Sequence, residues 1–209
     1  SLRIAQYNVP SWLTNKINLM YKWAVKVKIG NNLFPRFNDS PLDGSPKIST
    51  IIDFSEDVLK IKKGKNLSGL RSLFTSKNNN FLNTQTKIEN ISRYTDLKQT
   101  GWILFRPNKK WEFIIKCGEP CPRNLPAHVH SDLLSFDLFY DGKPVIAELG
   151  TSSYEKNKIR SYERSGAGHN VLQVSNIYSK NNKFRWIEPV EVWGNFRAGR
   201  KAKIILRES

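Results

Sequence analysis

The distribution of apolar positions divides the chain into a helical beginning and a longer part with strand-like alternation. Residues 11–29 carry apolar side chains at helical spacing, and Gly30 followed by Asn31 is a typical helix stop. Residues 48–61 have the composition of a second helix. Residues 62–98 are polar and weakly patterned, so we expect an exposed linker there.

From about Gly101 onward, short apolar runs alternate with turn signals. The dipeptide Asp141-Gly142 lies between two such runs and predicts a hairpin. Evenly spaced strands joined by polar turns predict a mainly β protein with an antiparallel β-sandwich. We expect strands over residues 102–105, 111–117, 134–140, 145–149, 171–174, 190–196 and 202–206. The last run has no partner after it, which predicts that the pattern continues beyond residue 209.

The chain is strongly basic, with a formal net charge of +16 over 209 residues. Such a surface attracts polyanions, including acidic polysaccharide, nucleic acid and an anionic membrane face, although it also fits a merely solvated surface. No zinc-finger spacing, RNA-binding aromatic motif or basic helix leading into heptads accompanies the charge, so nucleic acid is a distant third among these partners. No apolar run approaches the ~20 residues that a membrane span needs.

Two cysteines, Cys117 and Cys121, lie in the sequence Cys-Gly-Glu-Pro-Cys-Pro. They fit a small disulfide loop, two unlinked thiols, or a compact Cys2His2 zinc site with His128 and His130. The last interpretation is the weakest, because the two histidines lack the usual gap of three to five residues.

The three histidines of the chain, His128, His130 and His169, fall in only two places. Between them, an apolar run ends at the carboxylate of Glu148. If the first segment is a strand, His128 and His130 point the same way, and Glu148 lies on the far arm of the hairpin. Imidazole and carboxylate both suit zinc, so we predict a metal site that combines Glu148 and His169 with at least one of His128 and His130, and the other of these two can instead face a substrate.

Two other interpretations of the histidines are open. Cupins also combine His-x-His with a glutamate, but their glutamate follows within a few residues, where this chain has Leu134 and Ser135. Lone histidines are often structural and hydrogen-bonded to the backbone, which would leave no shared site.

These residues resemble the heparinase II/III family of polysaccharide lyases, which includes related alginate lyases. The family motif is His-x-His-x-Asp-x-Leu-Ser-Phe, then Asp-x-Gly, then Tyr-x-Arg-Ser running into Ala-His-Asn. The matching segments are residues 128–136, 148–150 and 162–170, and weaker similarity extends to residues 34–40, 101–106 and 192–200.

The resemblance implies an α/α-toroid followed by a β-sandwich of the supersandwich type. Residues 1–46 would then be the end of the toroid, with its helical segment and loop, and residues 47–209 the β-domain. The family cleaves uronic-acid-containing glycans, such as glycosaminoglycans or alginate, by β-elimination. Zinc would be bound by His130, Glu148 and His169, while His128 would neutralise the substrate carboxylate.

The resemblance also implies a bacterial protein of the periplasm or cell envelope, and a homodimer is compatible with it. Arg164 and Tyr162 are the substrate-binding candidates. Two departures from the motif stand out: Glu148 replaces the usual Asp, and Gly168 replaces Ala. The family's catalytic Tyr, with its Asn and His partners, belongs to the toroid, so we also consider a non-catalytic, metal-stabilised domain that binds acidic polysaccharide.

Overall fold

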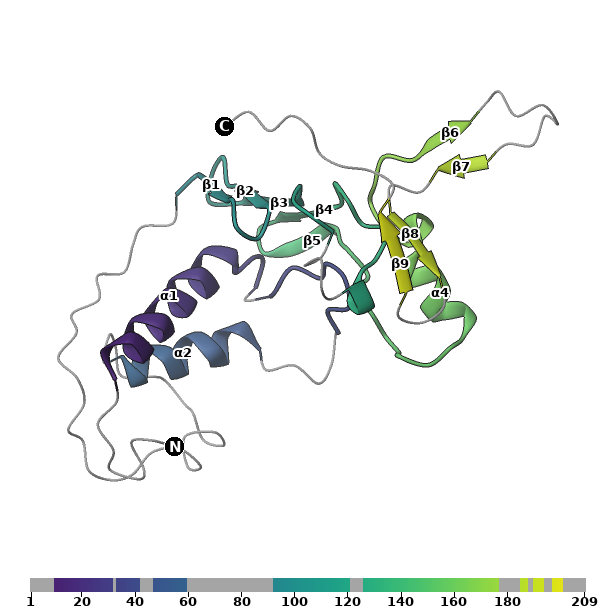
Figure 1. Cartoon of the computed structure of the whole chain (residues 1–209). Coiled ribbons are helices and arrows are strands. Elements are labelled where there is room, and N and C mark those ends of the chain that lie inside the picture. The colour runs from purple at the N-terminus through teal and green to yellow at the C-terminus, as the bar shows by residue number, and fades with distance from the viewer. Residues whose placement is uncertain are drawn as a thin grey trace. The chain divides into compact units, whose positions relative to one another are not determined.

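The computed structural model forms two compact units, each with its own packing (Figure 1). It describes residues 10–31, 33–41, 47–59, 92–120, 126–176, 185–187, 190–193 and 197–200. The first unit contains the two longer helices. The second contains residues 29–31, residues 35–41 and the described part of the chain from residue 92 onward.

The helical unit consists of α1 (Ser11–Val27) and α2 (Ile48–Val58), which confirms both predicted helices over these residues. The hydroxyl of Tyr21 on α1 donates a hydrogen bond to Oε1 of Glu56 on α2 at 3.0 Å, and both side chains are buried. Burial and the Glu56 carboxylate raise the pKa of Tyr21 above its ordinary value, so the hydroxyl keeps its proton. Because α2 packs on α1, it belongs to the helical unit, whereas the boundary predicted at residue 46 assigned it to the β-domain.

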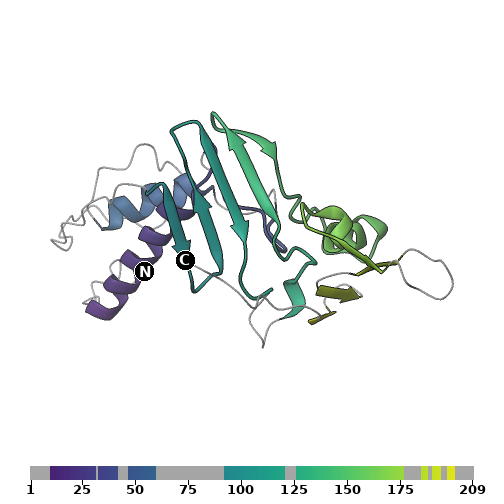
Figure 2. The same ribbon diagram turned by 90° about the horizontal axis from the view of Figure 1, so that it is seen from above.

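The second unit is built on a five-stranded antiparallel sheet in which each strand pairs with the next along the chain (Figure 2). The strands are β1 (Tyr94–Leu97), β2 (Trp102–Phe105), β3 (Trp111–Lys116), β4 (Phe136–Tyr140) and β5 (Lys143–Ile146). This confirms the predicted strands at β2, β3 and β4 and the mainly β, antiparallel fold class.

Two sequence expectations for this sheet were wrong. Residues 94–97, predicted as linker, form β1, because pairing with β2 selects a segment that has no long apolar run of its own. The strand expected over residues 145–149 begins and ends earlier, as β5 (Lys143–Ile146). There the two-residue turn of Asp141 and Gly142, both with positive φ, pairs Tyr140 directly with Lys143.

The sheet is apolar on both faces, as expected for one layer of a β-sandwich. One face buries Leu104, Ile114 and Phe139 against Ile29 and Phe37. The register places a second set of apolar side chains on the opposite face, where they are half-buried or exposed: Ile103, Phe105, Phe113, Ile115, Phe136 and Leu138. Residues 29–31 and 35–41 contribute Ile29 and Phe37 to the first face, and the second of these segments contains Asp39 of the candidate site.

The remaining described elements follow the sheet. They are η1 (Pro126–His128), which precedes β4, then α4 (Lys158–Arg164) and η2 (Gly166–Gly168), and two strand pairs, β6 (Val174–Asn176) with β7 (Arg185–Ile187) and β8 (Val190–Trp193) with β9 (Arg197–Arg200). Helix α4 and the strands β7 and β9 were not predicted from the sequence. The strand expected over residues 190–196 is present as β8 over its described part, and residues 194–196 lie outside the described residues.

The strand expected over residues 171–174 begins only at Val174. Asn170 is held instead by Glu148 and by the carbonyl of Phe136, so the chain runs as a loop to residue 173. The strand expected over residues 202–206 lies outside the described residues, as does Cys121. Among the described residues, no helix combines the length and apolar character needed to cross a membrane.

Candidate functional site

The candidate site lies at the end of the sheet where β3 and β5 finish and β4 begins. Its centre is Asp39, which accepts hydrogen bonds from Nδ1 of His128 at 2.8 Å and from Nε2 of His130 at 2.6 Å. Both guanidinium NH groups of Arg160 also contact this carboxylate, and the bond from NH2 is 2.8 Å long. Burial alone would raise the pKa of Asp39, but the hydrogen bonds from His130, Arg160 and His128 outweigh it and hold the pKa well below its ordinary value.

A buried ion pair fixes the backbone that presents Asp39. Nζ of Lys116, at the end of β3, lies 2.5 Å from Oδ1 of Asp132 and 2.7 Å from Oδ1 of Asn38. The backbone N–H of Asn38 donates to Oδ2 of Asp132 at 2.9 Å. Asn38 has a φ of 55°, a left-handed conformation that Asn tolerates better than most residues. The neighbouring Asp39 is therefore aimed at the histidines by a charged and largely buried support.

His128 and His130 reach Asp39 from a turn. The expectation that they share one face of a strand was wrong, because Pro126–His128 form the single 3-10 turn η1. The side chain of His130 is fully buried, whereas that of His128 is 52 % exposed. The ring of Tyr154 lies edge-on to His128, with centroids 6.3 Å apart. The site thus has a buried part and a part that solvent can reach.

Glu148 and His169 form the second half of the buried part. The backbone N–H of Glu148 donates to Oδ1 of Asp137 on β4 at 2.6 Å, which anchors the chain just after β5. Oε2 of Glu148 contacts Nδ1 of His169, and Oε1 accepts a hydrogen bond from the backbone N–H of Asn170 at 2.9 Å. Burial raises the pKa of Asp137 to about 6, and the nearby charge of Glu148 adds to this rise.

The rings of His130 and His169 lie with their centroids 5.3 Å apart. Nδ1 of His130 and Nε2 of His169 are buried, and neither has a hydrogen-bond partner among the residues that the structure describes. Burial lowers the pKa of His130 despite the hydrogen bond to Asp39, which favours the neutral imidazole that zinc requires. Two imidazole nitrogens therefore fit a metal ion.

The third predicted ligand, Glu148, instead directs one carboxylate oxygen at His169. Within the described ranges, no three His, Cys, Asp or Glu side chains converge in an arrangement that could hold a metal. The role of His130, Glu148 and His169 as zinc ligands stays a prediction.

Helix α4 supplies two buried arginines to the site. Arg160 donates to Oγ1 of Thr151 at 2.8 Å as well as to Asp39, and its guanidinium lies 5.2 Å from the centroid of the Tyr154 ring. Arg164 donates to the carbonyl of Val129 through Nε and NH2, at 3.2 and 3.1 Å. Glu163 accepts hydrogen bonds from the backbone and hydroxyl of Ser152, which fastens α4 to the loop after β5.

The two predicted substrate-binding residues have different surroundings. Arg164 is only 1 % exposed, so it supports the backbone between the two histidines and has no open path to a ligand in this conformation. Tyr162 is 52 % exposed and can contact a ligand from α4. Their roles in substrate binding stay predictions.

Asp39 and Arg160 were not predicted from the sequence as residues of the site. Asp39 lies in the segment of residues 34–40, whose resemblance to the family was noted, but no motif linked this carboxylate to the histidines. Arg160 lies two residues before Tyr162 in a stretch that showed no helical pattern. Neither residue lies in a local motif or spacing that would have identified it as part of the site.

Fold and site together define a β-sandwich domain with a histidine–carboxylate cluster at one end of its sheet. The family model described as "Heparinase II/III-like, C-terminal" matches residues 92–209, which is more than half of the chain. The chain therefore belongs to the heparinase II/III-like family.

Two solved structures of heparinase III share the fold. One, with methylated lysines, is 15 % identical with a TM-score of 0.52, and the match covers 81 % of this chain and 27 % of that one. The other is also 15 % identical, with a TM-score of 0.50 and coverage of 81 % and 28 %. This chain thus spans well under a third of the length of either structure. No curated protein sequence matches it.

Proposed function

We propose that this chain is the β-domain of a polysaccharide lyase that cleaves an acidic, uronic-acid-containing glycan by β-elimination. The observation that carries this proposal is His128, which is anchored on Asp39 through Nδ1 and half-exposed beside Tyr154. The bond to Asp39 uses Nδ1 and does not involve the other ring nitrogen, Nε2. When the ring is charged, its Nε2–H can donate to the carboxylate of a uronate unit.

Such a contact serves the first requirement of β-elimination. Neutralising the uronate carboxylate makes the proton at C5 more acidic. A base then removes this proton, the electron pair forms the C4–C5 double bond, the C4–O bond breaks, and an acid protonates the leaving oxygen. We assign only the carboxylate contact to this chain, through His128, because the family resemblance assigns the base and the acid to the toroid.

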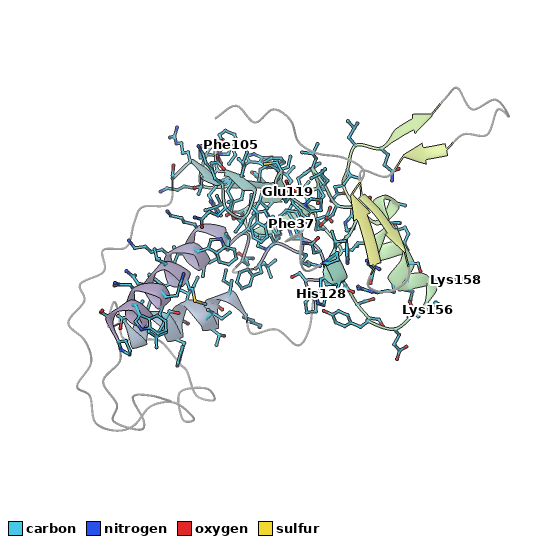
Figure 3. All side chains as sticks on the ribbon, in the orientation of Figure 1. Phe37, Phe105, Glu119, His128, Lys156 and Lys158 are labelled. Carbon is cyan, nitrogen blue, oxygen red and sulfur yellow. The ribbon has the colours of Figure 1, made fainter. Side chains whose placement is uncertain are left out.

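Basic side chains border the exposed part of the site. Lys156 and Lys158 flank the start of α4, at the same end of the unit as His128 (Figure 3). Both are exposed, and within the described part of the chain neither forms an ion pair. Together with the net charge of +16, they favour an anionic substrate.

We further propose that the buried part binds zinc through Nδ1 of His130 and Nε2 of His169, with Glu148 as the neighbouring carboxylate. Both imidazole nitrogens are buried and lack a hydrogen-bond partner among the described residues, which supports this assignment. The side chains of His130, Glu148 and His169 have no exposed surface, so a metal there would be out of reach of a glycan. When bound, zinc would contribute folding free energy and would fix the loops that hold His128.

A second candidate is a non-catalytic domain that binds acidic polysaccharide and is stabilised by the same metal. It is favoured by the deep burial of the histidine–carboxylate cluster, which gives the metal a structural place. For both candidates, the resemblance supports a location in the bacterial periplasm or cell envelope.

The test exposes uronate polymers, including heparin-like glycosaminoglycans and alginate, to the intact parent protein, in which this chain is joined to its toroid, and follows ultraviolet absorbance. New absorbance from the conjugated double bond, lost in His128→Ala, is the result expected for a lyase. Salt-sensitive binding without new absorbance would favour the second candidate. Neither binding nor absorbance with any of the polymers would refute both.

A further inference from the structure

We propose that Asp39 is a positioning residue that fixes which ring nitrogen carries the proton in both His128 and His130. An ionised carboxylate only accepts hydrogen bonds, and the two NH groups of the Arg160 guanidinium on Asp39 favour its ionised form. Each histidine nitrogen that faces Asp39 must therefore carry a hydrogen.

The two rings face Asp39 through different nitrogens. His128 uses Nδ1 and His130 uses Nε2, although the residues are only two apart in sequence. In their neutral forms, His128 must then be the Nδ1–H tautomer and His130 the Nε2–H tautomer. A single carboxylate thus gives its two imidazole partners opposite tautomers.

This arrangement decides which lone pairs are available. The unprotonated nitrogen of His130 is Nδ1, which is one of the two buried imidazole nitrogens that lack a hydrogen-bond partner among the described residues. By the same argument, Glu148 places the proton of His169 on Nδ1 and leaves Nε2 unprotonated. The two rings therefore contribute lone pairs, and no N–H, at their unpartnered positions. An oriented imidazole with its second nitrogen on a carboxylate is the form that metal sites favour.

Arg160 is the third side chain bound to Asp39. Its two NH groups contact the same carboxylate, and its side chain is fully buried. The guanidinium keeps its charge under all ordinary conditions, so it holds Asp39 in the ionised form whatever the state of the histidines. Without this partner, two imidazoles and one carboxylate could exchange a proton among themselves.

The tautomer of His128 gives the sharpest test, because the imidazole of free histidine in water prefers the Nε2–H form. Asp39 must therefore reverse the ordinary preference at His128 while reinforcing it at His130. His169 does not contact Asp39, so it serves as an internal reference. This part of the inference does not depend on the proposed glycan substrate, whereas the outward direction of Nε2 of His128 toward a uronate rests on the proposed function.

The experiment is nitrogen-15 NMR of the histidine rings in the metal-free chain, kept metal-free with a chelator, at a pH well above the ordinary histidine pKa. With three histidines in the chain, each ring can be assigned by substitution. The wild-type chain should show a protonated Nδ1 for His128, a protonated Nε2 for His130 and a protonated Nδ1 for His169. A wild-type spectrum with His128 in the Nε2–H form would overturn the proposal, even if Asp39→Asn did not fold.

The matched variants are Asp39→Asn and, as a control, Asp141→Asn in the exposed β4–β5 turn. Asp39→Asn should return His128 toward the Nε2–H form and leave His169 unchanged. Asp141→Asn should change none of the three rings. An Asp39→Asn spectrum identical to wild type would show that Asp39 does not set the tautomers. Binding of heparin-like polymer is measured in parallel. If the tautomers are as expected but the polymer does not bind, the result contradicts the proposed function and still supports the role of Asp39.

Discussion

Asp39 accepts a hydrogen bond from Nε2 of His130 at 2.6 Å, so a loop that precedes the family-matched region completes the histidine cluster. The family model begins at residue 92. The site of this unit therefore depends on a segment that the matched region does not contain. This dependence explains why residues 35–41 pack with the sheet rather than with the helices.

The buried ion pair between Lys116 and Asp132 should be essential for stability. Replacing Lys116 by Met removes one charge and leaves Asp132 buried without its cation, which typically costs ~3–5 kcal/mol. Lys143→Met, on the exposed start of β5, is the matched control and should change the free energy of unfolding by about 0.5 kcal/mol or less. Urea denaturation measures both values, and equal losses in the two variants would argue against a special role for Lys116.

The zinc proposal makes a prediction about metal content. The wild-type chain should carry about one zinc ion, measured by mass spectrometry of the purified protein. His130→Ala and His169→Ala should lose it, because each removes one of the two unpartnered nitrogens. His128→Ala should retain it, since this side chain is half-exposed and directs Nδ1 at Asp39. Zinc that survives loss of His130 would rule out this site.

Stability should respond to pH through Asp137. Its pKa rises from 3.8 in the unfolded chain to about 6 in the folded protein, so the folded form holds a proton that the unfolded chain releases first. The contribution of this group is therefore most favourable below about pH 4 and is lost as the pH rises to about 6, by roughly 3 kcal/mol at most.

Asp137→Asn isolates this effect, because the amide oxygen can still accept the hydrogen bond from the backbone N–H of Glu148. The stability of the wild type relative to this variant should fall between about pH 4 and pH 6 and stay level above that range. Urea denaturation across the range provides the comparison. A constant difference would mean that Asp137 has an ordinary pKa.

Glycan binding should depend on the basic residues beside His128. Replacing Lys156 and Lys158 together by Ala should weaken binding to heparin-like polymer by roughly 2- to 30-fold, since exposed charge pairs contribute about 0.2–1 kcal/mol each. The matched double variant at Lys109 and Lys110, in the β2–β3 turn, removes the same charge at the other end of the sheet. Its affinity should stay closer to that of wild type, and equal losses would indicate binding through net charge alone.

The local sequence pattern determined the central strands of the sheet and the family. The turn residues Asp141 and Gly142 and the apolar runs of β2, β3 and β4 specified a hairpin and an antiparallel sheet, because these signals depend only on neighbouring residues. The motifs around His130, Glu148 and His169 also indicated the family. The structure brings Glu148 onto His169 and the ring of His130 beside that of His169, and the role of the three residues as zinc ligands stays a prediction.

Only the tertiary structure decided how the site is completed. The partner of His128 and His130 is Asp39, which lies far away along the chain, and nothing in its local sequence says which groups it will meet. The same holds for β1, whose strand conformation comes from pairing with β2, and for Arg160, whose helix is fixed by Glu163 on Ser152. Periodicity and spacing specify how a segment folds on itself, whereas buried charges such as Asp39 acquire their partners only when distant segments pack together.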